Sequence, residues 1–126
     1  MSYTILIVED NPHNRILFRD VLTFHGYVVA VACDGNEAIT MTRELMPDLI
    51  LMDIQMPGMD GMAAGAILKE DPATSGLKLI ALTSCAMRGD QEKFLAAGFD
   101  DYLSKPINTR ELPNLVKRWL EGADQP

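Results

Sequence analysis

The sequence is poor in cysteine and in aromatic residues, and it contains no long apolar run. Of its 126 residues only 6% are aromatic and two are cysteines, Cys33 and Cys85, which are too few for a disulfide scaffold. No segment approaches the ~18 consecutive apolar residues of a membrane-spanning helix, and no signal peptide precedes the first apolar run. These absences predict a soluble, cytoplasmic protein with reduced thiols.

Positive charge is also scarce. The 11 lysines and arginines are outnumbered by 18 acidic residues, and the net charge of -7 argues against non-specific binding to DNA or to an anionic membrane. The shortage of positive charge lies in the first half of the chain: residues 1–63 have 3 basic and 9 acidic side chains, whereas residues 64–126 have 8 basic and 9 acidic ones. The surplus carboxylates of the first half suggest a cation site.

Five short apolar segments alternate with five helical patterns. The apolar segments are continuous, which is typical of strands that are covered on both faces; they lie at residues 5–8, 28–32, 49–52, 79–82 and 102–103. We predict helices over residues 12–25, from about 37 to 46, and over 62–70, 88–97 and about 110–120. Asn11 is expected to cap the first helix and Thr109 the last.

This alternation predicts an α/β fold, a three-layer (βα)5 sandwich around a parallel five-stranded sheet. The expected strand order is 2-1-3-4-5, which makes the first and third strands neighbours. Residues 1–122 are expected to form a single domain, and residues 123–126 a frayed tail.

Polar side chains follow four of the five predicted strands. Glu9 and Asp10 follow the first strand, Asp53 the third, Thr83 the fourth and Lys105 the fifth. In an open parallel sheet these ends meet at one edge, where ligands bind. Three clustered carboxylates repel one another unless a proton or a cation intervenes. Because no histidine or cysteine is near, their oxygens suit Mg2+ or Mn2+ better than zinc.

A divalent ion, a carboxylate, a hydroxyl and a lysine are the groups that phosphoryl transfer to an acyl oxygen requires. The metal and Lys105 neutralise the phosphoryl oxygens, the Thr83 hydroxyl donates a hydrogen bond, and an aspartate attacks.

Together with the loop at residues 56–61, these residues resemble the response-regulator receiver domain of two-component signalling. The resemblance covers the chain from Ile5 to about Leu120, and the chain is similar to stand-alone receivers of the DivK kind. The resemblance implies a flavodoxin-like receiver fold. It implies that Asp53 is the phosphoacceptor, with Thr83 as the switch hydroxyl and Tyr102 as the switch aromatic.

The resemblance also implies a ligand set for Mg2+, for which Mn2+ can substitute. Asp10 and Asp53 would bind the ion directly, Glu9 through water, and Gln55 through its backbone carbonyl. Lys105 would pair with the phosphate and precede a cis peptide bond at Pro106. We expect its pairing with the carboxylates to be partly solvated, so that Lys105→Ala changes stability by less than about 1 kcal/mol.

As a receiver, the protein would catalyse its own phosphorylation and dephosphorylation rather than act as a classical enzyme. The implied donor is a sensor histidine kinase or a histidine phosphotransfer protein, and the implied output is docking to a downstream protein. Nucleic-acid binding and membrane insertion are not expected, and the expected state is a monomer or a weak dimer.

Two other functions use similar folds. A phosphatase of the haloacid-dehalogenase type also has a strand-end aspartate nucleophile, but it needs a second aspartate where this chain has Gln55, and 126 residues leave no room for a cap domain. A flavodoxin-like redox module needs a hydroxyl-rich loop after the first strand, where Glu9 and Asp10 would repel a phosphate. For Tyr102, simple packing at the end of a strand is the alternative to a switch role.

Overall fold

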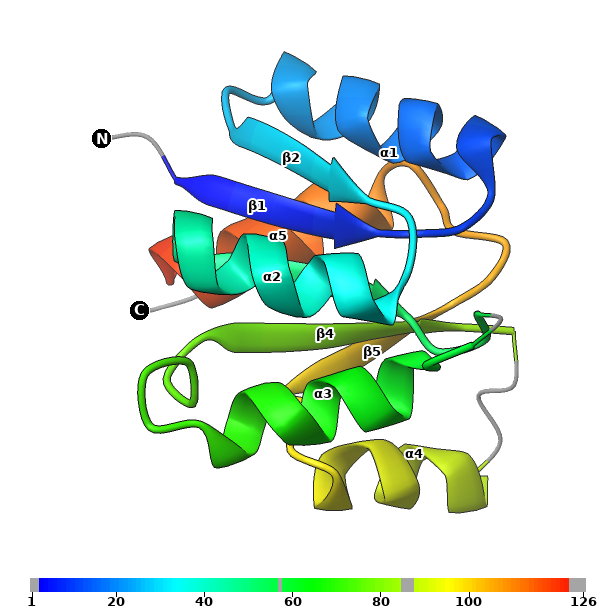
Figure 1. The fold of residues 1–126 in the computed structure, drawn as a ribbon. Helices are drawn as coiled ribbons and strands as arrows, with labels where there is room; N and C mark the ends of the chain where they lie inside the picture. Colours follow the sequence, from blue (N-terminus) through cyan, green and yellow to red (C-terminus); the bar gives the residue numbers. More distant parts are fainter. Residues whose placement is uncertain (1–2, 57, 85–87, 123–126) are drawn as a thin grey trace.

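The computed structural model describes residues 3–56, 58–84 and 88–122, and the chain alternates five strands with five helices (Figure 1). The strands are β1 (Thr4–Val8), β2 (Val28–Ala32), β3 (Leu49–Asp53), β4 (Lys78–Thr83) and β5 (Asp101–Ser104). The helices are α1 (Pro12–Phe24), α2 (Gly35–Leu45), α3 (Gly61–Glu70), α4 (Arg88–Ala96) and α5 (Glu111–Glu121). Cys85 and the tail at residues 123–126 lie outside the described residues.

The strands form one parallel sheet in the order β2-β1-β3-β4-β5, which confirms the predicted topology. The register aligns the strand ends, since Val8 lies opposite Met52, and Thr83 lies opposite Ser104. The residues that follow β1, β3, β4 and β5 therefore emerge at the same edge of the sheet.

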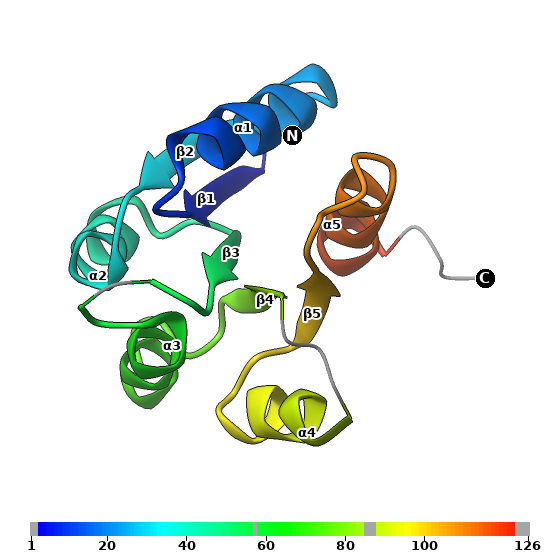
Figure 2. The same cartoon turned by 90° about the vertical axis from the view of Figure 1, so that its right-hand side faces the viewer.

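Helices cover both faces of the sheet, with α1 and α5 on one side and α2, α3 and α4 on the other (Figure 2). Side chains along a strand alternate between these layers: Leu6 and Val8 pack toward α2 and α3, whereas Ile5 and Ile7 pack toward α1 and α5. All four are fully buried, which explains why the run is continuously apolar. The edge strand β2 departs from this expectation, because Val28 is 52% exposed.

The start of α1 follows the capping residue that the sequence predicts, whereas the start of α5 does not. The side chain of Asn11 accepts hydrogen bonds from the amides of His13 and Asn14, as a cap of α1 should. The prediction that Thr109 caps α5 is wrong. The side-chain oxygen of Asn108 instead accepts from the amides of Arg110 (2.7 Å) and Glu111 (3.3 Å), and its short amide suits such a turn better than a hydroxyl does.

A close approach of α3 to the end of β3 requires glycine at position 61. A Cβ atom there would lie 2.8 Å from the Cα of Ile54 and would also collide with the backbone of Asp53. The amide of Gly61 donates to the carbonyl of Ile54 at 3.0 Å, which closes the loop after β3. No helix in the described part of the chain is long and apolar enough to cross a membrane.

Candidate functional site

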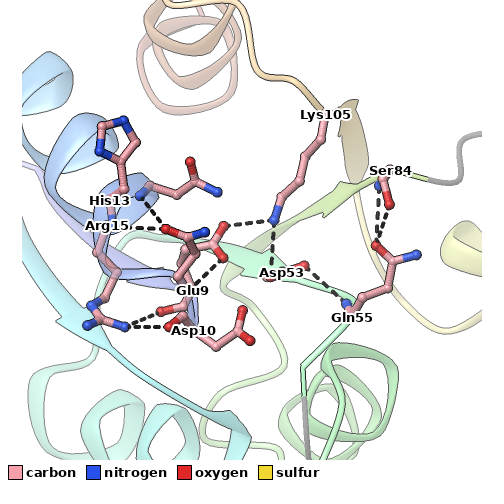
Figure 3. A network of polar contacts seen from close by, with 10 residues as sticks. Glu9, Asp10, His13, Arg15, Asp53, Gln55, Ser84 and Lys105 are labelled. Carbon is pink, nitrogen blue, oxygen red and sulfur yellow. Dashed lines mark hydrogen bonds and ion pairs between the residues drawn. The ribbon is translucent and has the colours of Figure 1, made fainter.

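Three carboxylates and one ammonium meet at the carboxyl edge of the sheet (Figure 3). Glu9 and Asp10 follow β1, and Asp53 ends the neighbouring strand β3, so the pairing of these strands brings the three acids together. One oxygen from each lies within 4.8 Å of the others. Glu9 and Asp53 are buried and Asp10 is exposed, so the cluster opens to solvent on the side of Asp10.

Lys105 bridges the two buried acids. Its Nζ lies 2.9 Å from Glu9 Oε1 and 3.1 Å from Asp53 Oδ2, and its amide donates to the carbonyl of Thr83 at 2.7 Å. The Lys105–Pro106 peptide bond is cis, as the resemblance implied. The expectation of a partly solvated pairing understates this contact, since the Lys105 side chain is 19% exposed and its partners only 0% and 2%. Truncating it would leave two buried carboxylates without their cation.

The charges of the cluster do not balance. Burial is the main cause that raises the pKa of Glu9, the neighbouring Asp53 also raises it, and the ammonium of Lys105 lowers it; the net result is a pKa of about 7. Burial alone would lower the pKa of Lys105, but its contacts with Glu9 and Asp53 raise it overall. One ammonium faces three carboxylates, and all the ligand atoms are oxygens. The residues present therefore fit a small divalent cation such as Mg2+.

Gln55 connects the acidic cluster to the loop that follows β4. Its amide donates to Asp53 Oδ1 at 3.0 Å, and its side-chain oxygen accepts from the Ser84 hydroxyl at 2.8 Å. One carboxylate oxygen of Asp53 is thus held by an amide and the other by Lys105. The chain offers no proton-transferring side chain at position 55, which disfavours the phosphatase alternative.

Thr83 and Tyr102 occupy adjacent strands on the α4 side of the sheet. Thr83 is 1% exposed at the end of β4. Tyr102, in β5, lies opposite Ala81 of β4, two residues before Thr83. The ring of Tyr102 is half-buried, and its centroid lies 6.3 Å from that of Phe94 in α4. Tyr102 therefore lies beside the strand that ends in Thr83 and packs its ring against α4, outside the cluster that Glu9, Asp10, Asp53 and Lys105 form.

Sequence reasoning missed one cation of the site, Arg15. Its Nη1 donates to the carbonyl of Glu9 at 2.9 Å and to that of Asp10 at 3.0 Å (Figure 3). The available signal was the spacing, because an arginine one turn into α1 can reach back to the carbonyls that precede the helix.

The comparisons with known proteins agree with this geometry. The family model described as the response regulator receiver domain matches residues 5–117. The chain is 40% identical over 123 residues to the polar-differentiation response regulator DivK of Brucella ovis, a match that covers 98% of this chain and 100% of the relative.

Two solved structures extend the comparison. The receiver domain of a sensor histidine kinase from Pseudomonas aeruginosa, solved with a magnesium ion coordinated in its active site cleft, has a TM-score of 0.87 at 36% identity, covering 96% of this chain and 99% of the other. A chain of the co-crystal structure of the Saccharomyces cerevisiae histidine phosphotransfer signaling protein Ypd1 and the receiver domain of its downstream response regulator Ssk1 has a TM-score of 0.88 at 28% identity, covering 98% and 92%. Because the family model matches residues 5–117 of the 126 and the acidic cluster is in place, the chain belongs to the family of response-regulator receiver domains.

Proposed function

We propose that Asp53 is the residue of this receiver that accepts a phosphoryl group from a phosphohistidine. The observation that supports the proposal is the surrounding geometry: Asp53 is a buried carboxylate beside an ammonium at 3.1 Å and within a cluster of two further acids. The single ammonium does not balance the three carboxylates, and a divalent ion that binds with the phosphoryl donor supplies the missing positive charge.

Four residues are proposed to hold Mg2+ in this site. Asp10 and Asp53 bind the ion directly, Glu9 binds it through water, and Gln55 contributes its backbone carbonyl. The bound ion supplies positive charge that neutralises the phosphoryl oxygens as they approach the acidic cluster. The burial of Glu9 and Asp53 strengthens this electrostatic effect, because the effective dielectric constant is lower there than in water.

The proposed step is a displacement at phosphorus. A carboxylate oxygen of Asp53 forms a bond to phosphorus while the bond from phosphorus to the imidazole nitrogen breaks, and the electron pair leaves with that nitrogen. The ammonium of Lys105 faces the charge on the transferred group, and the hydroxyl of Thr83 donates a hydrogen bond to it. Water later attacks phosphorus, the bond from phosphorus to the Asp53 oxygen breaks, and inorganic phosphate leaves while the carboxylate of Asp53 is regenerated.

The donor is proposed to be a sensor histidine kinase or a histidine phosphotransfer protein, and the output to be docking to a downstream protein. Membership of the receiver family and the structural similarity to a chain of a phosphotransfer–receiver co-crystal support this assignment. The new hydrogen bond of Thr83 would draw the end of β4 inward, and Tyr102 would change its packing against α4.

The phosphoacceptor assignment is tested with a small phosphodonor and Mg2+. Intact-mass analysis should show one added phosphoryl group on the wild type and none on Asp53→Asn, which keeps the shape of the side chain but removes the nucleophile. Asp60→Asn is the matched control, because Asp60 caps α3 and asparagine is an equally good cap. Equal labelling of Asp53→Asn and the wild type would exclude Asp53 as the acceptor.

The switch is tested with beryllofluoride, which mimics the phosphoryl group. The adduct should shift the NMR resonances of residues 90–97 and Tyr102 in addition to those around Asp53. Tyr102→Phe is not expected to abolish the shifts, since it keeps the ring, whereas Thr83→Val should confine them to the cluster. Shifts confined to the cluster in the wild type would contradict the coupling.

A further inference from the structure

Among the residues that the structure describes, Arg15 is the one cation that donates to the backbone of two proposed metal ligands, Glu9 and Asp10. We propose that Arg15 is a positioning residue for the divalent ion: its guanidinium holds the β1–α1 turn so that the carboxylate of Asp10 faces Glu9 and Asp53. This inference rests on the proposed Mg2+ site, and it deepens that proposal by naming the side chain that orders its exposed ligand.

Arg15 contacts the peptide groups on both sides of the Asp10 Cα atom. The carbonyl of Glu9 belongs to the peptide group that precedes the Asp10 Cα atom, and the carbonyl of Asp10 belongs to the group that follows it. Nη1 of Arg15 donates to both, at 2.9 and 3.0 Å, so both peptide planes are held by one nitrogen. Fixing these two planes fixes φ and ψ of Asp10, and with them the direction in which its side chain leaves the backbone.

Arg15 is itself well anchored. Its amide donates to the carbonyl of Asn11 at 3.0 Å in the first turn of α1, and Asn11 caps that turn through its side chain. The guanidinium therefore reaches back from a fixed helix to the turn that precedes it (Figure 3). A half-buried arginine in this position loses less conformational freedom on binding than a side chain on a loop would.

Of the three carboxylates, Asp10 is the one whose position depends on its backbone. Glu9 is held through its side chain by Lys105 and by the amide of Asn11 at 3.2 Å, and Asp53 is held by Lys105 and by the amide of Gln55. Across residues 3–56, 58–84 and 88–122, no group donates a hydrogen bond to the carboxylate of Asp10. An exposed ligand that its side-chain contacts do not order must be ordered through the main chain.

Positioning and simple charge predict opposite effects on metal affinity. As a cation beside a cation site, Arg15 repels Mg2+, so a purely electrostatic role means that its removal strengthens binding. As a positioning residue it raises the affinity, so its removal weakens binding. Groups that orient metal ligands typically contribute 10–100-fold in affinity.

The test is calorimetric titration of the unphosphorylated protein with MgCl2. Arg15→Met keeps the apolar stem but removes the donors, and it should bind Mg2+ about tenfold more weakly than the wild type. Arg15→Gln keeps one nitrogen with two hydrogens and should lose less than Arg15→Met. Arg19→Met is the matched control: Arg19 lies one turn further along α1, its ion pair is with Asp20, and its removal should leave the affinity unchanged or slightly raised.

A second measurement separates positioning from general loss of structure. Urea unfolding without metal reports the stability of each variant, and NMR relaxation of the Asp10 amide reports local order. If Arg15 orders the turn, the Asp10 amide should be more mobile in Arg15→Met than in Arg19→Met. If Arg15→Met does not fold, Arg15→Gln and Arg15→Lys decide, since both keep a donor of reduced reach and should bind Mg2+ less tightly than the wild type.

Unchanged or tighter Mg2+ binding by the folded Arg15 variants would overturn the positioning role while leaving the metal site intact. An equal loss in Arg19→Met would also overturn it, because the effect would then belong to the helix. A wild-type protein that binds no Mg2+ would contradict the proposed metal site itself, and the positioning role with it.

Discussion

Two lysines anchor polar clusters at opposite ends of the sheet, and the clusters differ in their charge balance. Lys105 lies at the carboxyl edge between Glu9 and Asp53. Lys69, near the end of α3, lies at the amino ends of β4 and β5, where it donates to the carbonyls of Ser75 (3.2 Å) and Leu77 (2.9 Å).

In the Lys69 cluster the charges balance, with one ammonium facing one carboxylate. The Nζ atom of Lys69 pairs with one carboxylate, Asp100 at 3.5 Å, and the same Asp100 oxygen accepts the amide of Leu79 at 2.8 Å. At the other end, three carboxylates share the ammonium of Lys105, and burial raises the pKa of Glu9 to about 7. A cluster that only stabilises the fold balances its charges, whereas the unbalanced edge is stabilised further when a cation binds.

The largest expected effect is that of Lys105→Met in the metal-free protein. Removing the ammonium leaves Glu9 and Asp53 buried without a cation, and we expect a loss of about 3–5 kcal/mol in the free energy of unfolding at pH 8. The loss should shrink at pH 5, where Glu9 is protonated. Urea unfolding of the wild type and the variant measures this loss at each pH. Equal losses in the free energy of unfolding at pH 5 and pH 8 would show that the site is not short of positive charge.

The raised pKa of Glu9 should make the stability of the metal-free protein depend on pH. This pKa is about 7 in the folded protein and near its ordinary value of 4.5 in the unfolded chain, so the folded state binds more protons between these values. The stability of the metal-free protein should therefore fall by roughly 2–3 kcal/mol as the pH rises from about 4.5 to about 7. The raised pKa of Lys105 adds nothing in this window, because its stabilisation is lost only when the pH passes its own, higher pKa.

Glu9→Gln should remove this slope, since the amide can still accept from Lys105 but does not titrate. Glu44→Gln, at an exposed position of α2, is the control and should leave the slope in place. Unfolding curves from pH 4.5 to 8 decide the matter. A slope that survives Glu9→Gln would assign the titration to another group.

The smallest effect is expected from the same substitution at the balanced end. Lys69→Met removes hydrogen bonds to two carbonyls and one ion pair, and should cost about 2 kcal/mol. The one carboxylate that is left without its cation, Asp100, is 27% exposed and still accepts the amide of Leu79. It lies at the opposite end of the sheet from the acidic cluster, so the cost should not change with Mg2+. A cost that varied with Mg2+ would remove the distinction between the two ends.

Much of the fold follows from local patterns. The five apolar runs predicted the strands because a parallel sheet buries both faces, and the position of Asn11 before Pro12 predicted the start of α1. The acidic cluster was predictable for a related reason, since the ends of parallel strands share one edge. The start of α5 was not, because Asn108 and Thr109 can both accept amide hydrogen bonds; the structure uses Asn108 in the turn before the helix and leaves the capping position to Arg110, whose side chain forms no capping hydrogen bond.

The sequence by itself determined the strands, their shared edge and the residue types that meet there, because these depend on the periodicity and on the order of segments along the chain. Only the tertiary structure decided how deeply Lys105 is buried between its two partners, and which side chain holds the turn before α1. Those features join residues up to 96 positions apart, as in the Lys105–Glu9 pair. Their strength depends on distance and on exclusion of water, which no local pattern of residues specifies.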